Sequence, residues 1–365
     1  MANRANPIPA ELPGPDVAAG QALAARAAAV LRPTGALARF DEVAAWLAQW
    51  QRTNRPAVER PVAIVFVADH GVAAEGVSAY PAAVTSEMLR ALQDGVATAS
   101  AMARSVGALV SVVDCGTGRP TRNIRTEAAL TEDRFATAWA GGAEAVQASD
   151  SDLLVFGEMG IGNTTAAAAV AAVLHGGPVE GWVGRGTGVD DAGWARKVDV
   201  VEQARARIHG TTDPLEVLRQ VGGAELVAIA GAIVEARVRS VPVLLDGYVV
   251  TAAAAALEAS RPGVLDHCVA AHLSPEPGHA ALLGRLGRRP LLDLDMRLGE
   301  GSGALAAVPL VRLAATVVVD VATFADRGLP PPPPPLPAAR SRSGTRNGAE
   351  RAPFLVPEPP FRGES

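Results

Sequence analysis

Short, uninterrupted apolar runs place the strongest limit on how this chain folds. They recur at residues 62–68, 108–113, 153–156 and 241–245, and alanine-rich segments separate them. An apolar run of this length is typical of a parallel strand buried on both faces, and strands that alternate with helices indicate βαβ units. The pattern therefore predicts an α/β fold with a mostly parallel sheet flanked by helices.

The two ends of the chain differ from this central part. Before the first run, proline-rich coil alternates with alanine-rich segments that predict helices at 18–31 and 40–51. From Pro330 an unbroken proline run leads into a tail rich in Pro, Arg, Ser and Gly. We expect residues 329–365 to be a disordered appendage, and a polyproline II segment that binds a partner is the alternative interpretation.

Charge and cysteine content exclude several classes of protein. The chain has 33 Lys and Arg against 38 Asp and Glu, a formal net charge of -5, whereas nucleic-acid-binding domains carry a basic excess. Cys115 and Cys268 cannot form a disulfide framework, which favours a reducing compartment. The N-terminus lacks an apolar signal-peptide core, and the longest uncharged stretch, 159–179, is interrupted by Asn, His, Pro and Gly. We expect a cytoplasmic protein with no nucleic-acid or membrane partner.

The first candidate site is the glycine-rich stretch 157–165, which follows an apolar run and precedes an alanine-rich helix. A strand, a glycine loop and a helix in this order direct backbone N–H groups at one point, which suits an anion such as phosphate. Asn163 and Thr164 are also favourable N-cap residues, so a tight turn with a capped helix is an equally good interpretation. The stretch is neither a Walker A loop nor a complete GxGxxG fingerprint.

A second glycine cluster covers residues 184–188. Its glycines allow close approach of a backbone to a ligand, and Arg185 adds a cation whose geometry matches phosphate or carboxylate. Asp190 and Asp191 then precede a helical stretch. A lone loop of this kind is more often a flexible surface loop, but two glycine clusters in one chain favour a functional role.

A third cluster surrounds Glu300 with glycines at 299, 301 and 303. A carboxylate between glycines has little side-chain packing against it, which suits a general base. A solvated turn glutamate is the alternative. The apolar run 304–319 predicts that the loop lies beside a buried element.

Two further segments offer polar side chains. Asp69 ends the run 62–68, and ligands of open α/β sheets bind beyond the carboxyl ends of strands; capping the next turn is its alternative role. Ser274 lies in HLSPEPGH, a segment whose two histidines and glutamate lack the spacing of a zinc motif. We therefore expect no metal there and interpret Ser274 as a hydroxyl donor to an anion.

Six segments, in one order, resemble the nicotinate-nucleotide–dimethylbenzimidazole phosphoribosyltransferase family. The resemblance runs from about residue 31 to residue 328. Its segments are ADHGVAAEGVSAYP, GEMGIGNTT, GRGTGVDDAGWARK, VLLDGYVVTAAA, HLSPEPGHA and LLDLDMRLGEGSGA. The family fold implies a catalytic unit over 1–328, with a large α/β part at about 61–300 and a smaller helical part from residues 1–60 plus C-terminal helices. It also implies a homodimer.

The resemblance implies a defined reaction. Nicotinate mononucleotide would donate its phosphoribosyl group to a ring nitrogen of 5,6-dimethylbenzimidazole, with inversion at C1′, to give α-ribazole 5′-phosphate and nicotinate in cobalamin lower-ligand assembly. The leaving pyridine nitrogen is already cationic and needs no general acid, so one base suffices. No cofactor and no metal are implied.

The resemblance also assigns roles to residues. Glu300 matches the catalytic glutamate, and Glu158, Lys197 and Asp246 match other positions of the substrate site. Together with the helix N-terminus, it predicts a 5′-phosphate site formed by Gly160, Gly162, Asn163, Thr164, Arg185, Gly186, Thr187 and Ser274.

One region departs from the family pattern. Glu87 stands where family members commonly carry Gln, and two further polar family positions appear as Ala36 and Ala91. That side of the family site faces the aromatic base, where Ser78 is still a candidate contact. The donor is thus better supported than the acceptor, and Glu87 could bind a different azole or a phenol. Two further hypotheses are a non-catalytic nucleotide- or base-binding protein and a nucleosidase.

Overall fold

A parallel sheet at the centre of the molecule confirms the predicted fold class. The computed structural model describes residues 6–330, and within them five strands pair in the order β2-β1-β3-β4-β5, all parallel. The strands are β1 (Pro61–Val67), β2 (Leu109–Asp114), β3 (Leu153–Met159), β4 (Val243–Leu245) and β5 (Cys268–Ala270). The first four coincide with the predicted apolar runs, and β5 was not predicted.

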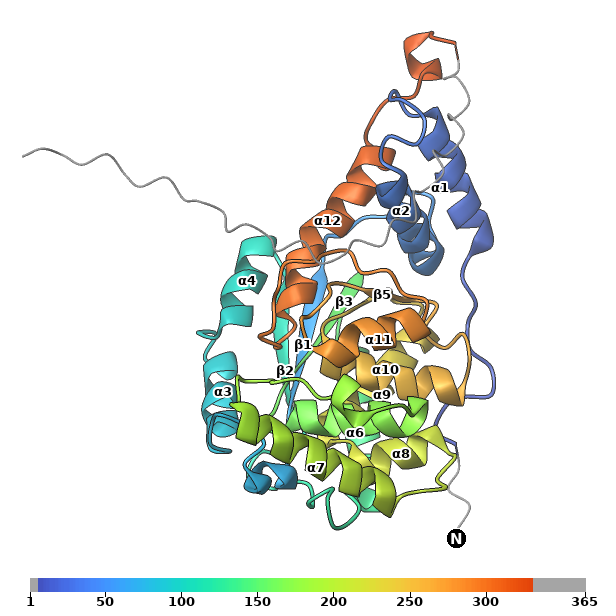
Figure 1. Ribbon diagram of the computed structural model, residues 1–365. Helices are drawn as coiled ribbons and strands as arrows, with labels where there is room; N and C mark the ends of the chain where they lie inside the picture. Colours follow the sequence, from blue (N-terminus) through green and yellow to red (C-terminus); the bar gives the residue numbers. More distant parts are fainter. Residues whose placement is uncertain (1–5, 331–365) are drawn as a thin grey trace, which may run out of the picture.

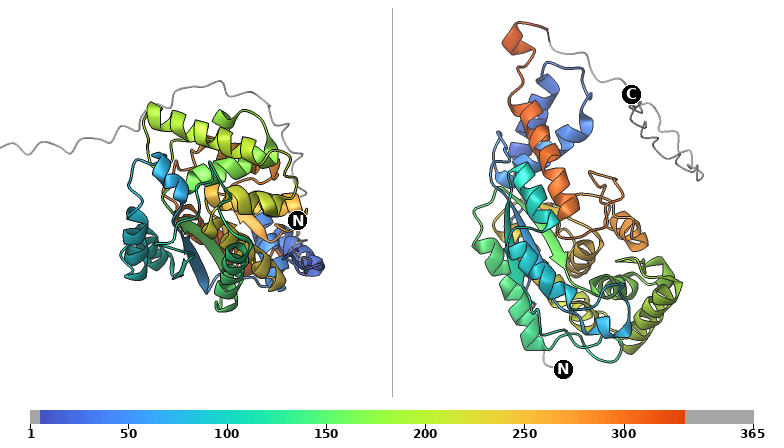
Figure 2. Two further views of the ribbon diagram at one scale, coloured as in Figure 1. Left: turned by 90° about the horizontal axis from the view of Figure 1, so that it is seen from below. Right: turned by 90° about the vertical axis from the view of Figure 1, so that its left-hand side faces the viewer.

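Helices cover both faces of this sheet (Figures 1 and 2). Side chains alternate across each strand, so Ile64 and Phe156 pack with one set of helices, while Val65 and Val155 pack with the other. The first set is α5 (Glu132–Gln147), α6 (Asn163–His175), α7 (Asp191–Arg207), α8 (Pro214–Val221), α9 (Ala224–Val238) and α10 (Tyr248–Ser260). The second set is α1 (Val17–Ala29), α2 (Ala38–Gln51), α3 (Val84–Gln93), α4 (Thr98–Val106) and α12 (Ser302–Val319). The short α11 (Pro277–Arg285) packs on α10.

The N-terminal helices α1 and α2 pack beside the C-terminal helix α12. Figure 1 shows α1 and α2 alongside the second half of α12, at the end of the molecule opposite α6, α7 and α8. Arg26 of α1 donates hydrogen bonds to the carbonyl oxygens of Val318 and Val319 (2.8 Å each) in the last turn of α12. These contacts join N- and C-terminal helices, as the family resemblance implies. The boundaries at residues 60, 300 and 328 stay predictions, and the tail from residue 331 lies outside the described residues.

The apolar run after Glu300 forms α12, a helix of 18 residues. Among the described residues, α12 is the one helix long and apolar enough to cross a membrane by length and composition, and 61% of it is buried inside the protein. It packs against α2, α4 and β3. The apolar character of α12 therefore matches the packing of a core helix.

Candidate active site

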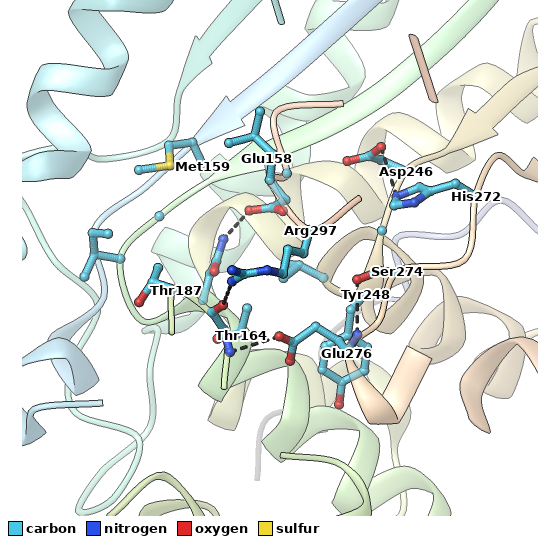
Figure 3. A pocket seen from close by; sticks show the side chains of 18 residues that line it. Glu158, Met159, Thr164, Thr187, Asp246, Tyr248, His272, Ser274, Glu276 and Arg297 are labelled. Carbon is cyan, nitrogen blue, oxygen red and sulfur yellow. Dashed lines mark hydrogen bonds and ion pairs between the residues drawn. The ribbon is translucent and has the colours of Figure 1, made fainter. Parts of the chain in front are cut away.

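A cleft opens beyond the carboxyl ends of β3 and β4, where an α/β sheet commonly binds its ligand. Its empty volume is about 650 Å³, the open space at the mouth included. Figure 3 shows side chains that enter it from several sides. The lining includes these residues named from the sequence: Glu158, Gly160, Asn163, Thr164, Gly186, Thr187, Asp246 and Ser274.

The N-terminus of α6 forms one wall of the cleft. Gly162 is its N-cap residue with φ of 99°, a conformation that favours glycine, and no side chain caps the helix. The expectation that Asn163 or Thr164 caps this helix is therefore wrong: the Asn163 amide instead donates a hydrogen bond to Glu158 Oε2. The first-turn N–H groups lack a side-chain cap and lie at the positive end of the helix dipole, so this wall attracts an anion.

Lys197 of α7 supports this wall from behind. Its Nζ donates to Thr164 Oγ1 (3.1 Å) and to the Gly184 carbonyl oxygen (2.9 Å), and the residue is 1% exposed. Burial lowers the pKa of the ammonium to about 8, and the nearby Glu276 carboxylate opposes that shift. These contacts use two of the three donors of the ammonium, and Lys197 itself does not line the cleft.

The backbone N–H and carbonyl groups of Gly186 hold the loop 184–188 in place. Its N–H donates to Glu276 Oε1 (2.9 Å), and its carbonyl oxygen accepts from Arg297 Nη1 (3.3 Å). Figure 3 shows Arg297 reaching into the middle of the cleft. Within the described chain, Arg297 is the only Arg or Lys that lines the cleft, and its guanidinium keeps further N–H groups for an anionic ligand.

A second, adjoining part of the cleft carries buried carboxyl groups. Burial raises the pKa of Glu158 to about 8 and that of Asp246 to about 7, and mutual repulsion adds to the shift of Glu158. Asp246 follows β4 and accepts hydrogen bonds from the N–H groups of Gly301 (3.2 Å) and Ala304 (2.9 Å). It thereby caps α12 from another part of the chain. Near neutral pH these carboxyl groups can accept hydrogen bonds from sugar hydroxyls or donate hydrogen bonds to them.

Glu300 lies directly behind this acidic wall. Its backbone has a φ of 61°, and its N–H donates to the Glu158 carbonyl oxygen (2.9 Å). Its Oε2 accepts from the Ala99 N–H (3.2 Å) at the start of α4. Burial raises the pKa of this carboxyl group above its usual range, as a base working near neutral pH requires. The neighbouring Gly299 lines the cleft, whereas Glu300 itself does not.

Other residues named from the sequence lie at the margin of the cleft or away from it. Ser78 Oγ hydrogen-bonds Thr187 Oγ1 (3.0 Å), which lines the cleft. Asp69 accepts from the Gly118 N–H (2.7 Å) and so holds the loop after β2. Glu87, Arg185 and Gly162 are likewise not among the lining residues.

Glu87 and Arg185 both have ion-pair partners of their own. Glu87 has a side chain 69% exposed and pairs with Arg90 (2.5 Å). Arg185 pairs with Asp191 (2.5 Å) and donates to the Val189 carbonyl oxygen (3.0 Å). Contact of either side chain with a ligand stays a prediction.

The cleft also contains residues that the sequence analysis did not assign to the substrate site. Tyr248, His272, Glu276 and Arg297 all line it, and each lies inside a segment that carries the family resemblance. Their presence in those segments was the signal that could have found them. Among residues 6–330, no group of three or more His, Cys, Asp or Glu side chains is arranged to hold a metal ion.

Comparisons with known proteins agree in one family. A family model described as phosphoribosyltransferase matches residues 12–329. Two proteins named nicotinate-nucleotide–dimethylbenzimidazole phosphoribosyltransferase, from Cereibacter sphaeroides and Ruegeria pomeroyi, are each 48% identical to this chain. The matches cover 319 and 317 residues, which is 87% of this chain and 94% of each relative.

Solved structures from Thermus thermophilus have the same fold. The one described as CobT superposes with a TM-score of 0.82 at 42% identity. The one described as a nicotinate-nucleotide-dimethylbenzimidazole phosphoribosyltransferase gives 0.81 at 41%. Each match covers 86% of this chain and 99% of the solved chain. The chain therefore belongs to the nicotinate-nucleotide–dimethylbenzimidazole phosphoribosyltransferase family.

Proposed function

We propose that this protein transfers the 5-phosphoribosyl group of nicotinate mononucleotide to 5,6-dimethylbenzimidazole in cobalamin lower-ligand assembly. The products are α-ribazole 5′-phosphate and nicotinate, and the configuration at C1′ inverts. One observation carries the proposal: a single cleft joins an anion-attracting wall, made by the α6 N-terminus and Lys197, to an acidic wall that includes Glu158 and Asp246.

The donor fits the cleft with its phosphate at the α6 wall. The Thr164 and Ser274 hydroxyls line this position, and Lys197 adds a positive charge behind Thr164. The ribose hydroxyls then face Glu158 and Asp246. Because the leaving pyridine nitrogen carries a positive charge, departure of nicotinate neutralises that charge and needs no proton donor.

Glu300 is the proposed general base. The attacking benzimidazole loses its N–H proton as the C1′ bond forms, and a carboxylate with a raised pKa accepts that proton near neutral pH. Glu158 is protonated over much of the neutral range because its pKa is about 8, so it is the poorer base of the two. The acceptor ring would lie between Gly299 and the N-terminus of α4, which Glu300 contacts.

Product analysis tests this proposal. The protein is incubated with nicotinate mononucleotide and 5,6-dimethylbenzimidazole, and the products are identified by mass spectrometry. We expect α-ribazole 5′-phosphate from wild type and a loss of about 10²–10⁴-fold in rate for Glu300→Gln. Glu127→Gln, which changes a carboxylate in an exposed ion pair with Arg122, is the matched control. Ribose 5-phosphate as the product would identify a nucleosidase, and donor binding without turnover would favour a non-catalytic binding protein or another acceptor.

A different acceptor is the second candidate, because α3 contacts the cleft and carries Glu87. The Thr85 hydroxyl of α3 accepts from the Ile161 N–H (3.2 Å), and Ile161 lines the cleft. Glu87 lies two residues further along α3, on another side of the helix from Thr85, and its exposed carboxylate can accept from N–H or O–H groups, as on another azole or a phenol. A panel of such acceptors with wild type and Glu87→Gln tests it, and an unchanged order of preference in Glu87→Gln would remove the hypothesis.

We also infer a cytoplasmic homodimer that acts on small molecules. Family membership supports the homodimer, and the balance of charges and the two cysteines support the compartment. Light scattering coupled to size-exclusion chromatography should give twice the mass of the chain. A single-chain mass at micromolar concentration would contradict the homodimer.

A further inference from the structure

We propose that His279, which does not line the cleft, is a positioning residue that holds two of its walls in place: the Ser274 loop and the Gly247 turn. The inference rests on the proposed function, because it assigns Ser274 to the donor's anion. His279 lies in the first turn of α11 and is fully buried. None of the roles assigned above to residues of the cleft involves His279.

A continuous chain of hydrogen bonds runs through the His279 ring. The backbone N–H of Ser274 donates to His279 Nδ1 (2.9 Å). His279 Nε2 lies 3.0 Å from Thr251 Oγ1, and the Thr251 hydroxyl donates to the Gly247 carbonyl oxygen (2.8 Å). Ser274 and Gly247 both line the cleft. The ring therefore links two wall segments that are otherwise separate in sequence.

The donor and acceptor roles in these hydrogen bonds determine which nitrogen of the His279 ring carries the proton. Since Nδ1 accepts from Ser274, it carries no proton, and the neutral ring must carry its proton on Nε2. That proton donates to Thr251, whose own hydroxyl is committed to Gly247. Burial, with a smaller contribution from His272, lowers the pKa of His279 to about 3, so the ring stays neutral at physiological pH and is unsuited to proton transfer there.

The neighbouring side chains leave little room for another arrangement. The His272 and Tyr248 rings, with centroids 6.0 Å and 6.4 Å from that of His279, pack beside it, and both residues line the cleft. Beyond Ser274, its Oγ accepts from the Glu276 N–H (3.3 Å), and Glu276 in turn holds the Gly186 N–H. Release of Ser274 would thus loosen the anion-binding side of the cleft.

Two substitutions of His279 separate its two bonds. The amide oxygen of Asn in His279→Asn reaches about as far as Nδ1 and can still accept from Ser274. The amide of Gln in His279→Gln reaches about as far as Nε2 and keeps only the Thr251 contact. We expect His279→Gln to raise the KM for nicotinate mononucleotide by roughly tenfold, the order expected when a buried N–H loses its acceptor. We expect His279→Asn to stay within about threefold of wild type.

Steady-state kinetics with each substrate varied in turn, and calorimetric titration with nicotinate mononucleotide, provide the readouts. The donor KM should rise in His279→Gln while the acceptor KM, kcat at saturation and the pH profile keep their wild-type values. Equal donor KM values for wild type and a folded His279→Gln would overturn the proposal, and so would a shifted pH profile. Failure of wild type to bind the donor would refute the proposed function instead.

If neither His279 variant folds, a second pair of variants, at Thr251, tests the proposed positioning role of His279. Thr251→Val removes the partner of Nε2 with little change in shape, and Thr251→Ser keeps the hydroxyl. Thr251→Val should raise the donor KM by about threefold or more, the smaller effect of an indirect contact, and Thr251→Ser should restore it. An unchanged donor KM in folded Thr251→Val would overturn the proposal.

Discussion

A single methyl group at Gly157 should displace the proposed base. Gly157 lies in β3, and the loop around Glu300 passes directly over its Cα. A Cβ placed there would lie 2.5 Å from the Glu300 carbonyl carbon and 2.6 Å from Gly301 Cα, and it would also collide with the Gly301 nitrogen. An ordinary van der Waals separation of 3.4 Å requires the loop to move by at least about 0.9 Å, and by more at the Gly301 nitrogen, the atom nearest to the added Cβ. Because the strand is central and buried, the loop must move rather than β3.

This displacement should reduce activity far more than stability. A shift of about 1 Å in a catalytic group can reduce the rate by about 100-fold, whereas overpacking costs about 1–3 kcal/mol of the free energy of unfolding. We therefore expect Gly157→Ala to fold, to melt at a lower temperature and to lose about two orders of magnitude in kcat.

The assay compares kcat at saturating substrates with thermal unfolding for Gly157→Ala and for Gly141→Ala. Gly141 lies in α5, and a Cβ added to it would meet no atom within 4 Å. Its substitution should therefore stabilise the protein by about 0.5–1 kcal/mol and leave kcat unchanged. A folded Gly157→Ala with wild-type kcat would refute the reasoning that this glycine sets the position of Glu300.

Further predictions concern buried charges. The rate of the proposed reaction should fall as pH decreases through the raised pKa of Glu300, because the base must be ionised; a pH profile of kcat/KM that stays flat down to pH 4.5 would argue against this base. The pKa of Glu158 is raised from 4.5 to about 8, so folding favours its protonated form and stability falls as pH rises across that interval. Glu158→Gln should therefore raise the melting temperature at pH 8.5, by about 2–4 °C for each kcal/mol recovered, and not at pH 4; equal shifts at both pH values would contradict this. His70 Nε2 and Glu225 Oε1 form a fully buried pair (2.6 Å), so Glu225→Ala should lower the free energy of unfolding in urea by about 3–5 kcal/mol, and a loss below 1 kcal/mol would show that the pair contributes little.

The local hydrophobic pattern predicts the first four strands of the sheet, but it does not predict β5. The runs at 62–68 and 153–156 are uninterrupted because β1 and β3 are covered on both faces. In contrast, β5 has three residues between His267 and His272, whereas β4, also of three residues, ends the longer apolar run 241–245. Similarly, α9 is buried on all sides and lacks the polar face that would give it a helical period.

For the site, residue types could be predicted, but their partners could not. Asn163 is a favourable cap by type, yet its amide bonds to the buried Glu158, a contact between the end of β3 and the start of α6. Asp246 caps α12 from 58 residues away, and His279 supports Ser274 from behind the cleft. Such pairings depend on how strands and helices pack, which a local pattern does not specify.

The cap that Asp246 provides has a consequence for how the protein is made. The two N–H groups that hold this buried carboxyl group belong to Gly301 and Ala304, and translation adds about 5–20 residues per second. The ribosome therefore needs about 3–12 s after Asp246 to add the 58 residues up to Ala304. During that time the five strands of the described sheet are completed, but the acidic wall still lacks its donors. A nascent chain that stops at residue 300 thus contains the sheet and the α6 loop without the N–H groups that hold Asp246. The segment that begins at Gly301 and continues as α12, the last α-helix of the described chain, supplies those groups and also the surface on which α1 and α2 pack.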